Sequence, residues 1–229
     1  MYRVSLRLVL ALLLATGSTR SSPAEAPPPA DSESVDRFAP LTAPVLEADE
    51  RSRLAAGEVV VRGLPPSDAD GIGVIVLGLV DAPPDQVWQV MSDCEEQDEF
   101  MPRITYAAVR DRDGDNHTCD LVVDLPYPAE DARAATRHHV SRLPDGGYQR
   151  RWELAPGDSS YHRNSGSWSV HPYADGRSSM LVNRIDLLPK SAVPVWILRA
   201  ANARQAPASF DAIRKRVRER QTRGQPALE

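Results

Sequence analysis

Hydrophobic residues recur with a period of two through most of residues 104–187, and this pattern constrains the fold more than any other feature. Successive side chains of a strand point to opposite faces, so a long run of this period predicts an antiparallel sheet. Turn sequences rich in Gly, Asp and Pro divide the run. We expect strands at 104–110, 117–125, 132–143, 148–154, 165–171 and 179–187.

Two β-branched segments precede this region, at 58–62 and 72–80, and bring the expected number of strands to about eight. A short polar helix is expected at 47–56. Pro83 and Pro84 favour the start of a second helix over 85–95, with Val87, Trp88 and Met91 on its apolar side.

The last element is expected to be a long amphipathic helix that begins at Pro194. Its apolar residues have helical spacing: Val195, Leu198, Ala201, Phe210, Ile213 and Val217. Pro207 lacks a backbone donor, so a kink or break is expected near Ala203. Together the segments predict an α+β fold.

The N-terminus has the composition of a secretory signal peptide, assigned to residues 1–22. Arg3 and Arg7 are positive, and the apolar core at 6–14 is too short to span a bilayer, although an uncleaved anchor stays open as the alternative. Residues 23–46 predict a disordered Pro/Ala-rich linker, 47–220 the folded domain, and 221–229 a disordered tail. We therefore expect an exported protein, periplasmic or secreted.

Charge and cysteine content narrow the function further. The net charge is −5 and no basic stripe is interleaved with aromatic residues, which argues against nucleic-acid binding. Cys94 and Cys119 are the only cysteines. Export would permit a disulfide between them, but the spacing alone leaves a bridge and two unpaired thiols both open.

Several local sequences resemble the START-like superfamily of helix-grip proteins, which includes polyketide cyclase-like and coenzyme Q-binding proteins. They are Ala-Pro-Pro-Asp-Gln-Val-Trp-Gln-Val at 82–90, Phe-Met-Pro at 100–102, Asn-Ser-Gly-Ser-Trp at 164–168 and Pro-Val-Trp at 194–196. The resemblance implies a curved antiparallel sheet of about eight strands wrapped around a long C-terminal helix. It also implies a cavity for a hydrophobic small molecule or lipid.

Strand alternation gives candidates for the cavity wall. These residues, together with one from the last helix, are expected to contact the ligand: Leu121, Val123, His138, Tyr148, Arg150, Trp152, Trp168 and Leu198. Core packing is the alternative role for the apolar residues, and exposure to solvent at a strand end is the alternative for His138 and Arg150. Arg184 and Asp186 share a strand face and are expected to pair with each other or to receive Arg150.

No metal site or cofactor is expected. His138 and His139 point to opposite faces of one strand, and the pair His117 and Cys119 has no evident third ligand. Motifs of serine hydrolases, zinc proteases and phosphate-binding loops are missing from the sequence, so no catalytic residue is assigned.

These observations predict a monomer that binds and transfers a hydrophobic ligand of the lipid, sterol or isoprenoid type. A cyclase or dehydratase and a non-catalytic interaction module are the alternatives. Loops at 101–103 and 190–194 are the expected gate. The basic residues between 214 and 223 predict either transient contact with a membrane surface or a solvated helix end.

Overall fold

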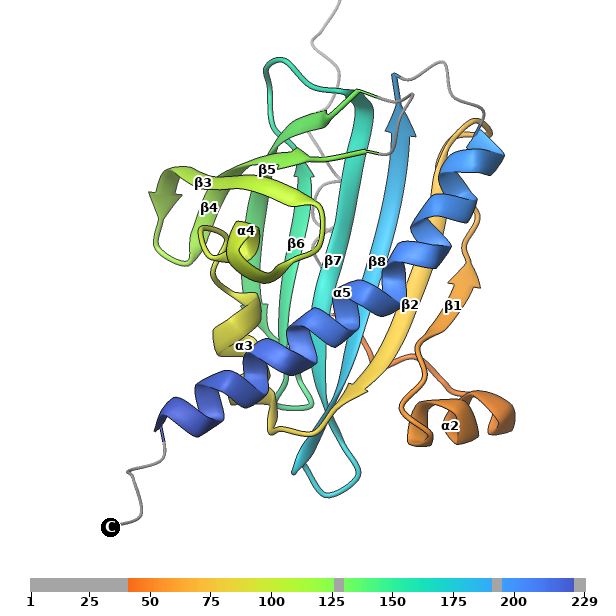
Figure 1. Ribbon diagram of the computed structural model, residues 1–229, viewed down its shortest axis with the longest axis vertical. Coiled ribbons are helices and arrows are strands. Elements are labelled where there is room, and N and C mark those ends of the chain that lie inside the picture. The colour runs from red at the N-terminus through yellow and green to blue at the C-terminus, as the bar shows by residue number, and fades with distance from the viewer. Residues whose placement is uncertain (1–40, 126–129, 191–194, 225–229) are drawn as a thin grey trace, which may run out of the picture. The chain divides into compact units, whose positions relative to one another are not determined.

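Eight antiparallel strands form one curved sheet in the computed structural model, which describes residues 41–125, 130–190 and 195–224 (Figure 1). Their order is β1-β2-β8-β7-β6-β5-β4-β3. The strands are β1 Val60–Gly63, β2 Ile72–Val80, β3 Ile104–Asp113, β4 Asn116–Val123, β5 Ala132–Arg142, β6 Tyr148–Leu154, β7 Tyr161–Tyr173 and β8 Ser178–Pro189. Each strand that the hydrophobic period predicted is present.

Helices pack on both faces of this sheet. They are α2 Ala48–Ala55, α3 Pro84–Met91, α4 Gln97–Phe100 and α5 Val195–Gly224. Leu54 of α2 packs with Leu77 and Met180 on one face. Phe210 and Ile213 of α5 pack on the other face in a cluster that includes α3. We call the face covered by α5 the helix-facing side. The α+β, helix-grip architecture is therefore confirmed.

The segment between β2 and β3 differs from the single helix expected over 85–95. Helix α3 ends at Met91, and α4 begins separately at Gln97. A disulfide joins Cys94, in the turn between them, to Cys119 of β4, which settles the pairing that spacing alone left open. The bridge holds this turn against the sheet, a tertiary constraint that periodicity does not report.

A kink or break was expected near Ala203, and the break is wrong because helix α5 is continuous through Pro207. Phe210 and Ile213 follow the proline and are almost fully buried, which holds the helix on the sheet past the missing hydrogen bond. Arg214 adds a bond from its Nε to the carbonyl oxygen of Leu79, at 2.9 Å. The helix continues to Gly224, beyond the expected domain boundary at residue 220.

The described residues lie within one compact unit, Arg37–Glu229. The expected signal peptide, most of the linker and residues 191–194 of the expected gate fall outside them, as do residues 225–229. Among the helices described, none has the length and apolar character needed to cross a bilayer.

Candidate functional site

The helix-facing side of the sheet is filled by side chains beneath the C-terminal half of α5. Val170 and Leu181 are fully buried there. The ring of Phe210 lies over Gly78 and its centroid is 5.7 Å from that of Trp168. We call this region the packed half. It forms a hydrophobic core beneath that part of the helix.

A second region of the same side carries apolar side chains that are only half-buried. The strand register places them on the helix-facing side, because they pair in rows with residues of known orientation such as Cys119. They are Leu121, Val123, Trp152, Leu154, Ile185 and Leu187. We call this region the open half. It offers an apolar surface beside the packed core.

The register also places the residues that the sequence predicted as ligand contacts. On the helix-facing side are Leu121, Val123, His138, Tyr148, Arg150, Trp152 and Trp168. Leu198 lies in α5, and its side chain is outside the described part of the structure. The predicted shared face is therefore observed for the strand residues, while their role in binding stays a prediction.

Three buried polar side chains lie between the packed half and the open half. His117 of β4, His138 of β5 and Arg150 of β6 are 3%, 4% and 2% exposed, and we call them the polar row. The two imidazole rings stack in parallel with centroids 4.9 Å apart. His138 also lies against Trp152, whose indole nitrogen donates to Asn164 at 2.9 Å.

Sequence reasoning missed His117 as a member of this group. It was considered only as a metal ligand beside Cys119. His117 lies two residues before Cys119 and four before Leu121 on the same strand, so all three share the sheet face predicted to line the cavity. The alternation alone could therefore have identified His117.

Arg150 receives a partner that the sequence did not suggest. With the Gln97 amide in α4 oriented so that its oxygen faces Arg150, that oxygen accepts hydrogen bonds from Nη2 at 2.9 Å and Nη1 at 3.2 Å. Burial lowers the pKa of Arg150 to about 10, and the negative charge of Asp93 opposes this shift. The guanidinium therefore stays charged at neutral pH.

The expected partnership of Arg150 with Arg184 or Asp186 is wrong. Asp186 pairs in register with Gly73 and lies on the face opposite to Arg150. There its carboxylate forms an ion pair with Arg163 at 3.2 Å. Alternation related Arg184 to Asp186 correctly, but it could not relate their strand to β6.

A pocket of about 420 Å³ opens next to the polar row. Its lining residues are Trp88, Ser92, Asp93, Arg112, Asp115, Val140, Ser141, Arg142 and Tyr148. Trp88 and Tyr148 stack with centroids 5.1 Å apart and form an aromatic wall. Val140 is paired directly opposite Arg150 in the sheet, so the pocket adjoins the polar row.

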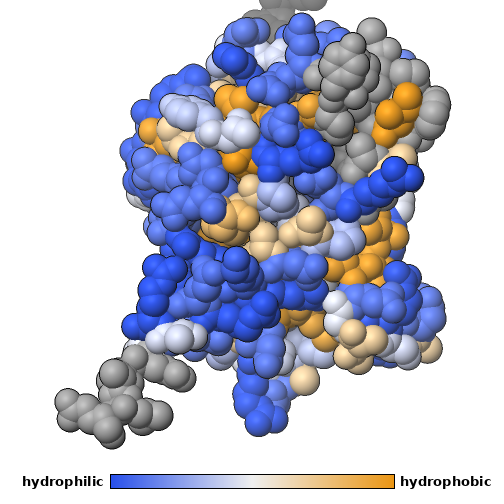
Figure 2. All heavy atoms as spheres, in the orientation of Figure 1, coloured by the Kyte–Doolittle hydropathy of each residue, from blue (hydrophilic) through white to orange (hydrophobic). Residues whose placement is uncertain are grey.

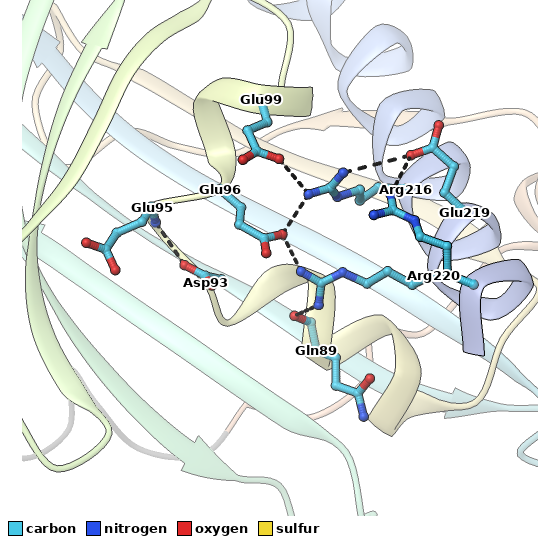
Figure 3. Close-up of polar contacts among 9 residues, drawn as sticks. Gln89, Asp93, Glu95, Glu96, Glu99, Arg216, Glu219 and Arg220 are labelled. Carbon is cyan, nitrogen blue, oxygen red and sulfur yellow. Dashed lines mark hydrogen bonds and ion pairs between the residues drawn. The ribbon is translucent and has the colours of Figure 1, made fainter.

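Helix α4, which carries Gln97, is held in place by two arginines of α5 (Figure 3). Arg216 donates to Glu96 at 2.9 Å and to Glu99 at 2.7 Å. Arg220 binds Glu96 and also donates to the carbonyl oxygen of Gln89 at 2.8 Å. The hydrogen bond from Arg216 is the main reason that the pKa of Glu96 lies below its usual value.

These ion pairs engage part of the basic run that suggested membrane contact. Arg216 and Arg220 face α4, whereas Lys215 and Arg218 lie with Arg223 on another side of the helix. The C-terminal half of α5 presents a mainly hydrophilic surface in Figure 2. Transient membrane contact and a solvated helix end both stay predictions for Lys215, Arg218 and Arg223.

A Ser–His–Asp chain lies on the opposite face of the sheet. His171 binds Asp145 through Nδ1 at 2.7 Å and Ser169 through Nε2 at 3.0 Å. Ser169 and His171 have no exposed surface, and neither lines the pocket next to the polar row. The chain therefore links the turn after β5 to β7. No group of three or more metal-ligating side chains occurs among the residues that the structure describes.

Comparison with known proteins gives a family match over residues 80–214, described as polyketide cyclase / dehydrase and lipid transport. A search of curated proteins finds no match.

Solved structures share the fold at low identity. The STAR-related lipid transfer protein of Xanthomonas axonopodis has a TM-score of 0.62 and 17% identity, over 70% of this chain and 93% of its own. Human StAR-related lipid transfer protein 5 has a TM-score of 0.60 and 15% identity, over 72% and 84%. The Zhui aromatase/cyclase of a Streptomyces species has a TM-score of 0.56 and 18% identity, over 67% and 97%.

Proposed function

Because the chain belongs to the polyketide cyclase / dehydrase and lipid transport family, we propose that it binds an apolar molecule and carries it unchanged between membranes. The open half of the helix-facing side carries this proposal. Its apolar side chains are half-buried beside a core that is otherwise closely packed. Two structural neighbours are named for lipid transfer, which supports the same function.

The energetics of such a carrier are favourable. Each methylene removed from water contributes about 0.8 kcal/mol, so a long alkyl chain offsets the several kcal/mol that association costs. A bilayer solvates the same chain almost equally well. Release therefore depends on contact with a membrane rather than on chemistry.

Export is part of this proposal. The charged and apolar segments at residues 1–22 have the pattern of a signal peptide. The disulfide between Cys94 and Cys119 supports an oxidising location, since such bonds persist mainly outside the reducing cytosol. N-terminal sequencing of protein recovered from fractionated cells tests it: a mature chain that begins near residue 23 outside the cytosol is expected, and an intact Met1 in the cytosol contradicts export.

Ligand binding is tested on the purified full chain in two ways. Mass spectrometry of an organic extract is expected to show a copurifying apolar molecule. Titration with Nile red is expected to show saturable binding. Ala134→Trp places a large ring on β5 opposite Leu121, within the open half, and is expected to weaken the binding about tenfold.

Arg137→Trp is the matched control, because it introduces the same ring on β5 but at an exposed position on the other face. Equal affinity of both variants would place the ligand elsewhere. An empty extract with no Nile red binding would contradict a carrier and support an interaction module.

A cyclase or dehydratase is the second candidate, favoured by the burial of two imidazoles and a guanidinium next to a pocket. Incubation with a hydroxylated polyketide separates the two functions. A carrier returns the molecule with its mass and absorption unchanged, a dehydratase returns it lighter by one water, and a cyclase changes its absorption at constant mass.

A further inference from the structure

The polar row contains hydrogen-bonding atoms that the fold itself does not use. Within the described part of the chain, no partner lies within reach of His117 Nε2, His138 Nδ1 or Arg150 Nε. All three side chains are almost fully buried, so bulk water does not satisfy these atoms. A ligand that enters beside them must therefore match their pattern of donors and acceptors.

The hydrogen bonds that are present assign the protons of both imidazoles. His117 Nδ1 lies 3.3 Å from the carbonyl oxygen of Asp115, which can only accept, so Nδ1 carries the proton and Nε2 a lone pair. Thr136 Oγ1 lies 3.4 Å from the carbonyl oxygen of Cys119, which can only accept, and 2.8 Å from His138 Nε2. We assign the single hydroxyl proton to the carbonyl, so that Thr136 accepts from Nε2 and a lone pair is left on His138 Nδ1.

The charge state agrees with this assignment. Burial is the main cause that lowers the pKa of both histidines, and the positive charge of Arg150 adds to the effect. Both rings are then neutral at pH 7. Arg150 remains a cation whose Nη atoms bind Gln97, and its Nε–H is left as a donor.

The polar row thus presents two acceptors and one donor. An alcohol or phenol group matches it, because its O–H donates to an imidazole nitrogen while its oxygen accepts from Arg150 Nε. An ether lacks the proton, and a carboxylate would place its lone pairs against those of the imidazoles.

We propose that the polar row recognises the hydroxyl group of an otherwise apolar ligand. This inference rests on the proposed function, since the ligand's apolar part would lie against the open half. The pocket adjoins the row, because Asp115, whose carbonyl holds His117, and Val140, which pairs with Arg150, both line it.

The test compares ligands that differ only at the polar end. Displacement of Nile red from the full chain is measured with hexadecanol, methyl hexadecyl ether and palmitate. The alcohol is expected to bind about tenfold more tightly than the ether or the carboxylate. Cholesterol and 2-naphthol, added as further arms, show whether the hydroxyl belongs to a sterol or a phenol.

His138→Phe keeps a ring against His117 and removes the imidazole nitrogens, so the preference for the alcohol over the ether is expected to fall at least about threefold. His139→Phe changes the neighbouring residue on the other face and is expected to keep the preference. Nitrogen NMR of the wild-type protein gives a measurement that needs no variant: hexadecanol is expected to shift the resonance of the unprotonated Nδ1 of His138.

The outcomes separate the two proposals. Equal binding of the alcohol and the ether to the wild-type protein, with no shift of that resonance, would overturn hydroxyl recognition and leave the carrier function standing. Failure of every ligand, Nile red included, would overturn both.

Discussion

The ring of Phe210 lies directly against the α-carbon of Gly78, so that a β-carbon on Gly78 would be 2.4 Å from Phe210 Cδ1. Phe210 belongs to the cluster of buried side chains that forms the packed half. Glycine is needed here for close approach rather than for its backbone angles.

Gly78→Ala is therefore expected to lower the free energy of unfolding by about 1–3 kcal/mol through overpacking. Gly63→Ala is the control, because a β-carbon there meets nothing within 4 Å. Combining Gly78→Ala with Phe210→Leu should cost less than the sum of the single changes. Chemical denaturation measures the wild-type protein, the two single variants, the double variant and the control, and strict additivity would argue against the contact.

The Cys94–Cys119 disulfide predicts a redox-dependent stability. The bridge closes a loop with a sequence separation of 25 residues, for which chain entropy gives about 3 kcal/mol of stabilisation. Reduction, or replacement of both cysteines by serine, is expected to lower the free energy of unfolding by this amount. Dithiothreitol should not affect the serine variant, and an unchanged denaturation midpoint for the reduced wild-type protein would contradict the prediction.

The ion pairs between α4 and α5 predict a measurable coupling energy. Arg216 is only 13% exposed in its side chain and binds both Glu96 and Glu99. A double-mutant cycle with Arg216→Gln and Glu96→Gln is expected to give about 1 kcal/mol. The exposed pair Lys215 and Glu219 is the control, with a coupling expected near zero. Similar values for both pairs would show that the buried arrangement adds nothing.

The polar row predicts a loss of stability in mild acid. The pKa of His117 and of His138 in the folded protein lies below the ordinary value of 6.5, mainly because of burial. Below pH 6.5 the unfolded chain therefore binds protons that the folded chain does not, and stability falls as the pH decreases. The slope reaches at most about 1.4 kcal/mol per pH unit for each histidine.

Denaturation midpoints between pH 7.5 and 5 measure this dependence. The double variant with His117→Gln and His138→Gln is expected to flatten the curve, whereas His162→Gln, at an exposed position of β7, should leave it unchanged. A wild-type slope retained in the double variant would mean that other groups cause the acid response.

Periodicity predicted the sheet well because the alternation of apolar and polar residues within each strand shows which side chains are buried. The rows that contain His138, Trp152 and Trp168 follow directly from alternation within their strands. Contacts between segments that are distant in the sequence produce no such pattern. The partner of Arg150 is Gln97, which comes from a short helix whose position depends on the disulfide and on Arg216.

The two wrong predictions also concern contacts between segments that are distant in the sequence. Asp186 was predicted as a partner of Arg150 because the alternation of side chains within β8 does not show which of its faces packs against α5. The lost backbone bond of Pro207 alone predicts a kink or break near Ala203, whereas burial of Phe210 and Ile213 keeps the helix continuous.

The pairing of β2 with β8 has a consequence for the time at which this chain can fold. Residues 72–80 are synthesised early, yet their neighbours in the sheet and the helix that covers them come from residues 178–189 and 195–224. Folding slows when contacts join parts of the chain that are distant in sequence. We therefore expect a folding time of roughly milliseconds to seconds. A ribosome-bound chain that still lacks β8 and α5 would keep β2 uncovered, so the native core forms only once residues 178–224 have been synthesised.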